Sequence, residues 1–257
     1  MTVLPPNSML SAMSASDLSV LRPHIKTVAF RHRHVLYEPG DTVDRAYFPH
    51  TGMISVVPVM ADGCGVETAT IGNEGIFGAM TGFAPYTTTA RVLVQTPLTV
   101  SQIAAGPFRE IAGRSTAMRT LIAHYHEALL AQVQITAACN ALHPIHERLA
   151  RWLLQTSDRL DGLVLPLTQE LLSGMLGVRR SSVSKAAGKL QQAGLIQYNR
   201  GSIRIVHRHA LESATCECYE AIKQSALQHT QGSIGAGTLP GSQRLDLGNL
   251  FHPRAPG

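Results

Sequence analysis

One segment constrains this chain more than any other: residues 171–211 contain seven Lys or Arg side chains and no Asp or Glu. The whole chain has 22 basic and 17 acidic residues, so its excess positive charge is concentrated in this segment. A basic face without acidic residues is typical of a surface that neutralises phosphate groups. Charge alone fits an ordinary solvated surface equally well. The residue pattern inside the segment must therefore distinguish a phosphate-binding surface from a solvated one.

The segment and the residues just before it have the pattern of two short helices joined by a glycine turn. Thr168 can cap the first helix, whose apolar stripe ends at Leu176. Gly177 is expected to end this helix, because glycine readily adopts positive φ at a helix C-terminus. A second helix is expected from about Ser181 to Gln192. Such a pair predicts a helix-turn-helix, whose second helix enters the major groove of DNA.

The N-terminal part of the second helix carries the side chains expected to face the bases. Arg180 and Lys185 are long enough to reach guanine O6 and N7, whereas the serines suit phosphate contacts. Residues 195–206 alternate around a turn and predict a β-hairpin, or wing, at the sugar–phosphate backbone. The predicted DNA-contacting residues are Thr168, Gln169, Arg179, Arg180, Ser181, Ser182, Ser184, Lys185, Lys189, Arg200 and Arg204.

Residues 168–206 resemble the winged helix-turn-helix of the Crp-Fnr family of bacterial transcription regulators. The resemblance is carried by the stretch LTQELLSGMLGVRRSSVSKAAGKLQQAGLI. Arg180 and Lys185 stand where the family usually has basic residues on its recognition helix. Ser181 stands where the family has a glutamate that accepts a hydrogen bond from cytosine N4, and serine is no charged acceptor. The resemblance implies double-stranded DNA and a second copy of the chain as partners, with RNA polymerase as a further partner.

The amino-terminal half has a different pattern. Residues 28–106 contain short apolar segments separated by turn residues, which predicts an antiparallel roll or barrel of short strands. This half resembles the family's cyclic-nucleotide-binding β-roll, whose turn glycines match Gly40, Gly52 and Gly72. The resemblance implies an effector pocket made by Gly75, Phe77, Gly78, Ala79, Thr88, Thr89, Ala90 and Tyr125.

Two departures from nucleotide-binding relatives argue against cyclic AMP in the usual binding mode. Those relatives use a Phe-Gly-Glu segment to hold the ribose, but the matching segment here ends in Ala79. They clamp the phosphate with an arginine, whereas Thr88 stands at that position. Arg91 comes three residues later and is expected on the other face of its strand, because strand side chains alternate. No bound cofactor is therefore predicted, and either a different small effector or none is expected.

Residues 115–141 connect the two halves and have apolar residues at steps of three and four, which predicts a long helix. Part of this stripe is expected to pack on the chain's own β-domain. The family uses the helix as a two-chain coiled coil, and the spacing here allows it. Two recognition helices about one DNA turn apart can read a palindrome, which gives dimerisation a physical reason. Pro144 suits the first turn of a new helix, and His143-Pro144 is the expected hinge.

No metal site, catalytic group or membrane segment is predicted. Cys216 and Cys218 fall in a stretch with a helical pattern, where residues two apart point about 200° apart and cannot share one ion. The four cysteines show no closely spaced cluster of the kind that holds an iron–sulfur centre, although a lone redox-active thiol stays open; they are Cys64, Cys139, Cys216 and Cys218. The chain has no phosphate-binding loop, HExxH motif, nucleophile elbow, signal peptide or long apolar run. A cytoplasmic protein that is not an enzyme is expected.

Together these patterns predict an α+β protein with an N-terminal antiparallel β-roll, a long dimerisation helix and a C-terminal winged helix-turn-helix. The expected function is a homodimeric, sequence-specific transcription regulator that is gated by an effector or by thiol chemistry. The alternatives are a constitutive DNA-binding protein, an enzyme fused to a winged helix, and a protein–protein interaction module. The expected parts are a flexible N-terminus (residues 1–16), an effector domain (17–112), a dimerisation helix (113–142), a DNA-binding domain (143–212), a C-terminal helix (213–227) and a disordered tail (228–257).

Overall fold

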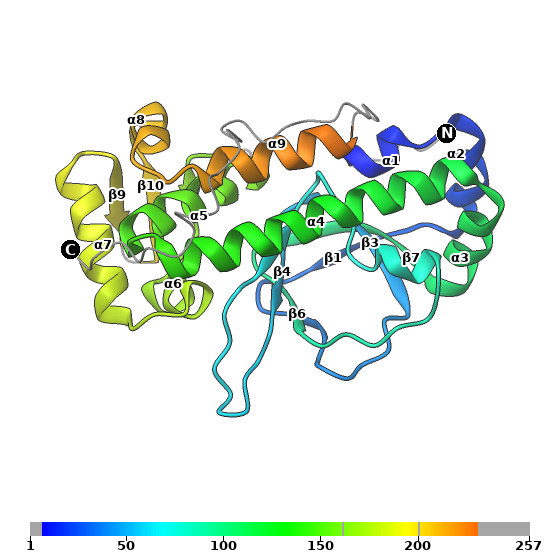
Figure 1. Cartoon of the computed structure of the whole chain (residues 1–257), viewed down its shortest axis with the longest axis horizontal. Coiled ribbons are helices and arrows are strands. Elements are labelled where there is room, and N and C mark those ends of the chain that lie inside the picture. The colour runs from blue at the N-terminus through cyan, green and yellow to red at the C-terminus, as the bar shows by residue number, and fades with distance from the viewer. Residues whose placement is uncertain (1–6, 161, 200, 231–257) are drawn as a thin grey trace, which may run out of the picture.

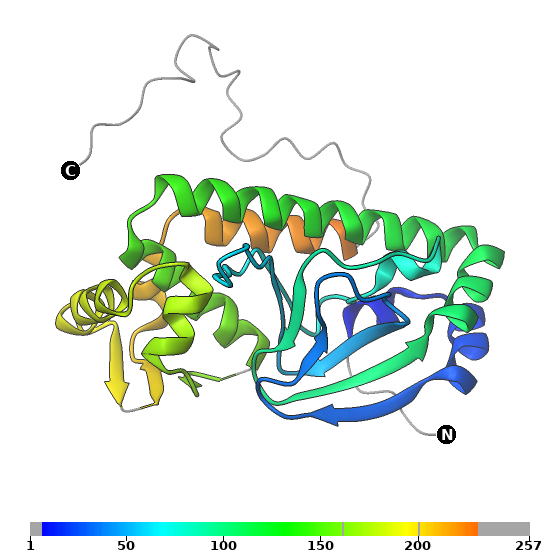
Figure 2. The same cartoon turned by 90° about the horizontal axis from the view of Figure 1, so that it is seen from below.

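The computed structural model describes residues 7–160, 162–199 and 201–230. A β-roll, a long helix and a winged helix-turn-helix follow one another along the chain (Figure 1). The long helix runs along one side of the roll and reaches the helical C-terminal part at its far end (Figure 2). The predicted fold class, with an antiparallel roll and a C-terminal winged helix, is confirmed.

The N-terminal residues pack on the roll. The Asn7 side chain donates hydrogen bonds to the carbonyl oxygens of Pro49 and Gly75, at 2.8 and 2.9 Å. Met9 and Leu10 are buried. The expected flexible N-terminus is therefore wrong for residues 7–16, and residues 1–6 lie outside the described part. The elements here are α1 (Ser8–Ala12), α2 (Ala15–Leu21) and the 3-10 helix η1 (Arg22–His24).

Two antiparallel sheets form the roll, one with the strand order β1-β7-β3 and the other with the order β2-β6-β4-β5. Inward and outward residues alternate along residues 91–94. Val92 and Val94 are buried, whereas Arg91 and Leu93 are half-buried. This alternation lets the two sheets enclose one apolar interior. The elements are β1 (Lys26–Phe30), β2 (Val35–Tyr37), β3 (Arg45–Thr51), β4 (Ile54–Val57), β5 (Ala69–Ile71), η2 (Ala79–Gly82), β6 (Arg91–Val94) and β7 (Leu98–Ala104).

The connector consists of α3 (Ala105–Arg114) and the 27-residue α4 (Thr116–Leu142). The Ser115 side chain caps α4 by accepting a hydrogen bond from the backbone N–H of Met118 at 3.1 Å. Met118, Ile122 and Tyr125 on the predicted stripe are buried against the roll. No helix of the described residues is long and apolar enough to cross a membrane.

A second stripe on α4, which was not predicted, is exposed. Its members follow one another at alternating steps of three and four residues, so they lie on one face of the helix. Three of the seven are alanines, which let another helix approach closely. They are Thr120, Ala123, Glu127, Leu130, Gln134, Ala137 and Ala141.

The C-terminal domain packs two crossing helices on a third and on a small sheet. Leu149 and Leu153 of α5 share one core with Leu172 of α6 and with Val183 and Leu190 of α7. The sheet has three strands in the order β8-β10-β9, so the predicted hairpin gains a strand that was not predicted. The elements are α5 (Ile145–Leu160), β8 (Val164–Leu165), α6 (Gln169–Leu176), α7 (Arg180–Gln192), β9 (Ile196–Asn199), β10 (Ser202–Ile205) and α8 (Arg208–Ser213).

The last described helix, α9 (Cys218–Thr230), returns from this domain and lies alongside α4 (Figures 1 and 2). Ile222 and Ala226 of α9 line a pocket together with Tyr125 and Leu129 of α4. The expected C-terminal helix thus begins later than residue 213 and extends into the range predicted to be a disordered tail. Residues 231–257 of that predicted tail lie outside the described part.

Candidate nucleic-acid interface and effector region

The helix-turn-helix forms where its sequence pattern places it. The Thr168 hydroxyl caps α6 by accepting a hydrogen bond from Leu171 N at 3.2 Å, and Gly177 ends the helix at a φ of 63°. That positive φ favours glycine over a residue with a Cβ. The second helix starts at Arg180, one residue before the predicted start.

The two faces of α7 have opposite chemistry. Val183, Ala186, Ala187 and Leu190 are buried in the domain core. The exposed side carries cations along its length, and no acidic residue lies in this helix. The predicted contact residues that are exposed on or next to α7 are Arg179, Arg180, Ser181, Lys185 and Lys189. Ser182 is half-buried.

Gln169 connects the two helices at the predicted interface. Its Oε1 accepts a hydrogen bond from Ser184 Oγ at 2.9 Å and one from Arg180 Nε at 3.5 Å. The Ser184 hydroxyl is therefore hydrogen-bonded within the protein, and Gln169 also accepts a long hydrogen bond from Nε of the Arg180 guanidinium. Such a bond limits the conformations of a long side chain before it meets DNA, which lowers the entropy lost on binding.

The wing brings one predicted residue to the surface beside α7. Arg204 is exposed on β10. Gly201 in the turn has a φ of 84°, which favours glycine. Arg200 lies outside the described residues. Gln191 Oε1 of α7 accepts a hydrogen bond from the backbone N–H of Tyr198 at 2.9 Å, so the wing is attached to the recognition helix.

The predicted effector residues fall into two groups, and aromatic rings surround the first. Phe77 is buried, and its ring centroid lies 5.8 Å from that of Tyr37 and 6.4 Å from that of Tyr47. Gly78 and Ala79 begin the adjacent turn, with Gly78 at a φ of 82°. These rings pack together in the apolar core of the roll.

Thr88, Thr89 and Ala90 form the second group, in which Thr88 and Ala90 are hydrogen-bonded to each other. The Thr88 hydroxyl is buried and donates to Ala90 O at 2.9 Å, whereas Thr89 is exposed. Arg91 forms an ion pair with Glu38, with 2.9 Å between Nε and Oε2. Its guanidinium is therefore engaged by a carboxylate of the chain itself.

Gly75 and Tyr125 bring the roll and α4 into direct contact. A Cβ at Gly75 would lie 2.3 Å from the Tyr125 hydroxyl oxygen, so this site requires glycine. Burial raises the pKa of Tyr125 above its ordinary value. Next to them, Arg159 of α5 pairs with Glu74, with 2.7 Å between Nη2 and Oε1. The C-terminal domain thus reaches into the region predicted to hold an effector.

Sequence reasoning missed a second contact between the two domains. Glu67, just before β5, is buried; it accepts a hydrogen bond from Trp152 Nε1 of α5 at 2.6 Å and another from Ser55. Burial raises the pKa of the Glu67 carboxyl to about 7, although both hydrogen bonds and the charges of Arg151 and Arg159 lower it. Trp152 is the chain's single tryptophan, and this was the one feature of the sequence that could have pointed to the contact.

A cleft of about 200 Å³ opens beside the Arg159–Glu74 pair, between the roll, α5 and α9. Its lining combines charged ends with an apolar wall that includes Tyr219 and Ile222. The charged members are Glu74, Asp158, Arg159 and Lys223. None of these residues was among the predicted effector residues.

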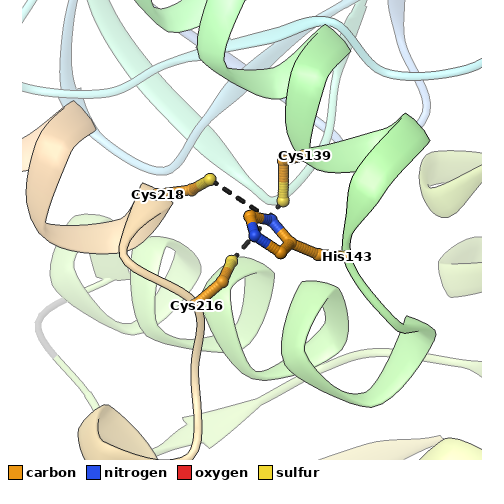
Figure 3. A group of neighbouring side chains, drawn as sticks. All are labelled: Cys139, His143, Cys216 and Cys218. Carbon is orange, nitrogen blue, oxygen red and sulfur yellow. Dashed lines mark hydrogen bonds between the residues drawn. The ribbon is translucent and has the colours of Figure 1, made fainter. Parts of the chain in front are cut away.

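Three cysteines and a histidine lie together where α4 ends and α9 begins, which was not predicted. Cys216 lies before α9 rather than within it, so the helical argument that separated its sulfur from that of Cys218 fails. The ligand atoms of Cys139, His143, Cys216 and Cys218 all lie within 4.8 Å of one another (Figure 3). Hydrogen bonds from Cys216 and Cys218 lower the pKa of Cys139, with a smaller contribution from Arg151. The expectation that Cys216 and Cys218 cannot share one ion is therefore wrong.

Comparison with protein-family models identifies both halves of the chain. A cyclic nucleotide-binding domain matches residues 27–115, and a Crp-like helix-turn-helix domain matches residues 147–214. Comparison with curated protein sequences finds no match.

Solved structures of transcription regulators share the fold. FixK2 from Bradyrhizobium japonicum is 17% identical, with a TM-score of 0.65 over 75% of this chain and 98% of that chain. The c-di-GMP responsive global regulator CLP from Xanthomonas campestris is 18% identical, with a TM-score of 0.62 over 76% of this chain and 100% of that chain. TTHA1359 from Thermus thermophilus, a regulator of the CRP/FNR family, is 22% identical, with a TM-score of 0.61 over 74% of this chain and 97% of that chain.

Proposed function

Because the chain belongs to the Crp-Fnr family of transcription regulators, which are not enzymes, we propose that it acts as a homodimer on a palindromic DNA operator. The observation that carries the proposal is α7, whose outer face holds Arg180, Lys185 and Lys189 without a neutralising acid. A helix with one buried face and one cationic face suits the major groove.

Gln169 supports a division of roles on this helix. Arg180, held by Gln169, reads a base edge, because a bidentate arginine–guanine contact demands a defined geometry. Lys185 lies further along the same helix and reads the next part of the half-site. Lys189, Arg204 and Arg200 contact phosphates and position the domain.

The exposed stripe on α4 supports dimerisation. Its spacing suits a two-chain coiled coil, and Leu130 at its centre has 43% of its surface exposed in the single chain. Pairing along this stripe would cover it and place two copies of α7 on one face of DNA. RNA polymerase is a further proposed partner, since a promoter-bound regulator lies beside it.

The domain contacts support gating by a small effector at the roll. Such an effector would bind in the cleft beside Glu74 and Arg159 and shift the population of orientations of α5, and with it of α7. The alternative, a ligand-independent or thiol-gated regulator, predicts equal operator affinity with and without small molecules. Micromolar binding of cyclic AMP or cyclic GMP in calorimetry would contradict the proposal that the effector is not a cyclic nucleotide bound in the usual mode.

The proposed function is tested by genome-wide mapping of bound sites followed by footprinting with the purified chain. An inverted repeat whose halves lie about one DNA turn apart, protected on one face, is the expected result. Protection of a single half-site, or protection without sequence preference, would contradict the proposal.

A further inference from the structure

We propose that Cys139, His143, Cys216 and Cys218 bind one zinc ion that joins the C-terminal end of α4 to the start of α9. The four side chains come from two segments far apart in sequence, and they converge on one point (Figure 3). Three cysteines and one histidine form a ligand set typical of structural zinc.

Two distances between the ligand atoms are close to those around a tetrahedral ion. Cys139 Sγ lies 3.5 Å from Cys216 Sγ, and Cys218 Sγ lies 3.5 Å from His143 Nδ1. Zinc–sulfur and zinc–nitrogen bonds of ordinary length put two sulfurs about 3.8 Å apart and a sulfur and a nitrogen about 3.6 Å apart. A disulfide would need about 2.05 Å between sulfurs, so the spacing matches ligands around an ion better.

Local structure explains how the sequence builds this arrangement. Cys139 and His143 are four residues apart at the end of α4, a separation that places two side chains on one helix face. The backbone N–H of His143 still donates to Cys139 O at 3.1 Å, which fixes the last turn. Cys216 precedes α9 and Cys218 is its first residue, so the bend between them turns both sulfurs toward α4.

Glu217 supplies the partner that a zinc-bound histidine usually has. His143 presents Nδ1 to the sulfurs, and its Nε2 lies 3.3 Å from Glu217 Oε1. A carboxylate at that nitrogen holds the proton on Nε2 and leaves the Nδ1 lone pair free for a metal. Glu217 is thus a positioning residue, and it lies between Cys216 and Cys218 in sequence.

Two buried arginines lie beside the site and offset its negative charge. Three thiolates, a neutral imidazole and a divalent ion carry one net negative charge. Arg148 and Arg151 beside them are only 6% and 3% exposed. Arg148 also donates to Asn140 Oδ1 at 3.1 Å, so it is fixed next to the end of α4. Buried cations are costly unless negative groups accompany them, and the zinc–thiolate centre would be one such group.

Four protein ligands leave no open coordination position, so the site is structural rather than catalytic. Its place gives it a consequence for the whole chain, since it lies directly before Pro144 and the start of α5. The ion would fasten α9 against α4 and fix how the chain enters the C-terminal domain. If the proposed DNA-binding function holds, zinc loss lowers operator affinity, but the site itself rests on its ligands alone.

The test is the metal content of the purified full-length chain, loaded with one equivalent of zinc under reducing conditions and then dialysed. We expect one zinc per chain and, with cobalt instead of zinc, the charge-transfer absorption of thiolate ligands. Replacing one ligand should lower zinc affinity more than about 100-fold, the upper range for outer-shell partners. The ligand variants are Cys139→Ser, His143→Ala, Cys216→Ser and Cys218→Ser.

Cys64→Ser is the matched control, because Cys64 is an exposed thiol away from the cluster, and it should retain the full zinc content. Glu217→Gln should bind zinc about tenfold more weakly and keep the cobalt spectrum. Because a ligand variant can fail to fold, the wild-type chain is also melted with and without a chelator, and the chelator should lower Tm. Less than half an equivalent of zinc, an unchanged Tm, or a Cys139–Cys216 disulfide in the native chain would each overturn the proposal. All these readouts are independent of DNA.

Discussion

The indole N–H of Trp152 donates a hydrogen bond of 2.6 Å to the carboxylate of Glu67, across the boundary between the C-terminal domain and the β-roll. Both side chains are buried, and Ser55 donates to the same carboxylate. A buried polar pair of this kind has few alternative partners, so it favours one relative orientation of the two domains.

The pKa of Glu67 makes this contact sensitive to pH. Burial raises the pKa to about 7 from an ordinary value of 4.5. The folded chain therefore holds a proton that the unfolded chain releases between these values, and the free energy of unfolding falls as pH rises through them. The Glu67 contribution to this fall is on the order of 3 kcal/mol at most. Urea unfolding of wild type and Glu67→Gln at pH 5 and pH 8 measures it.

The Glu67→Gln variant should lose the Glu67 part of the pH dependence and keep the rest, because an amide is neutral at both pH values. Glu38→Gln is the control, since Glu38 is half-exposed in a surface ion pair. An identical pH dependence in wild type and Glu67→Gln would contradict a raised pKa at this site.

The Arg159–Glu74 pair gives a second test of the domain contact. The Arg159 side chain is only 9% exposed, so removing its carboxylate leaves a buried guanidinium without its charged partner. We expect Glu74→Gln to lower the free energy of unfolding by about 2–4 kcal/mol in urea titration. Glu110→Gln breaks an exposed pair with Arg114 and should cost less than about 0.5 kcal/mol. Equal effects of the two variants would show that the buried pair does not connect the domains.

The helix-turn-helix could be predicted because its signals are local. Thr168 caps α6 and Gly177 ends it through contacts within a few residues, and the buried face of α7 repeats at helical spacing. The start of α7 at Arg180 differs from the predicted start by one residue, because the first turn of a helix is held by few hydrogen bonds and its limits are weakly encoded.

Features that depend on distant residues could not be predicted. The N-terminal helix α1 is held because Asn7 bonds to Pro49 and Gly75, which only the folded roll brings near. The short strand β8 exists because Leu165 pairs with Ile203, and two residues carry no periodic signal. Cys216 follows a stretch with helical composition, and the bend that takes it out of α9 depends on packing against Cys139.

Truncation of Arg180 and of Lys189 should affect DNA binding in different ways. Arg180→Ala should weaken binding to the cognate operator by about 1–3 kcal/mol and relax specificity at one base pair. Lys189→Ala should weaken binding to all sequences alike and reduce the slope of log affinity against log salt by about one. Fluorescence anisotropy on cognate and scrambled duplexes at several salt concentrations separates the two effects. Arg114→Ala removes a cation far from α7 and should change neither, and an unchanged operator affinity in Arg180→Ala would refute the docking of α7.

Ser181 should set part of the half-site preference. It is exposed on the first turn of α7, next to Arg180, where relatives have a glutamate that accepts from cytosine N4. Ser181→Glu should gain preference for a cytosine at one position of the half-site, by about 1–3 kcal/mol over the other bases. Selection from a random duplex library with both proteins measures the shift, and Ser173→Glu on α6 is the control. Identical selected half-sites from wild type and Ser181→Glu would show that residue 181 does not face a base.

Leu130 tests the exposed stripe of α4 as the dimer interface. Its side chain is 43% exposed in the single chain, and a carboxylate in its place would be buried beside its own copy and beside Glu127 in a symmetric coiled coil. Leu130→Glu should weaken the dimer by about 3 kcal/mol or more, since each dimer buries two like charges. Sedimentation velocity across a concentration series should then show protomers at concentrations where we expect the wild type to be a dimer. Val20→Glu is the matched control, because Val20 is a comparably exposed apolar residue on α2. A Leu130→Glu chain that sediments as wild type would exclude this stripe as the interface.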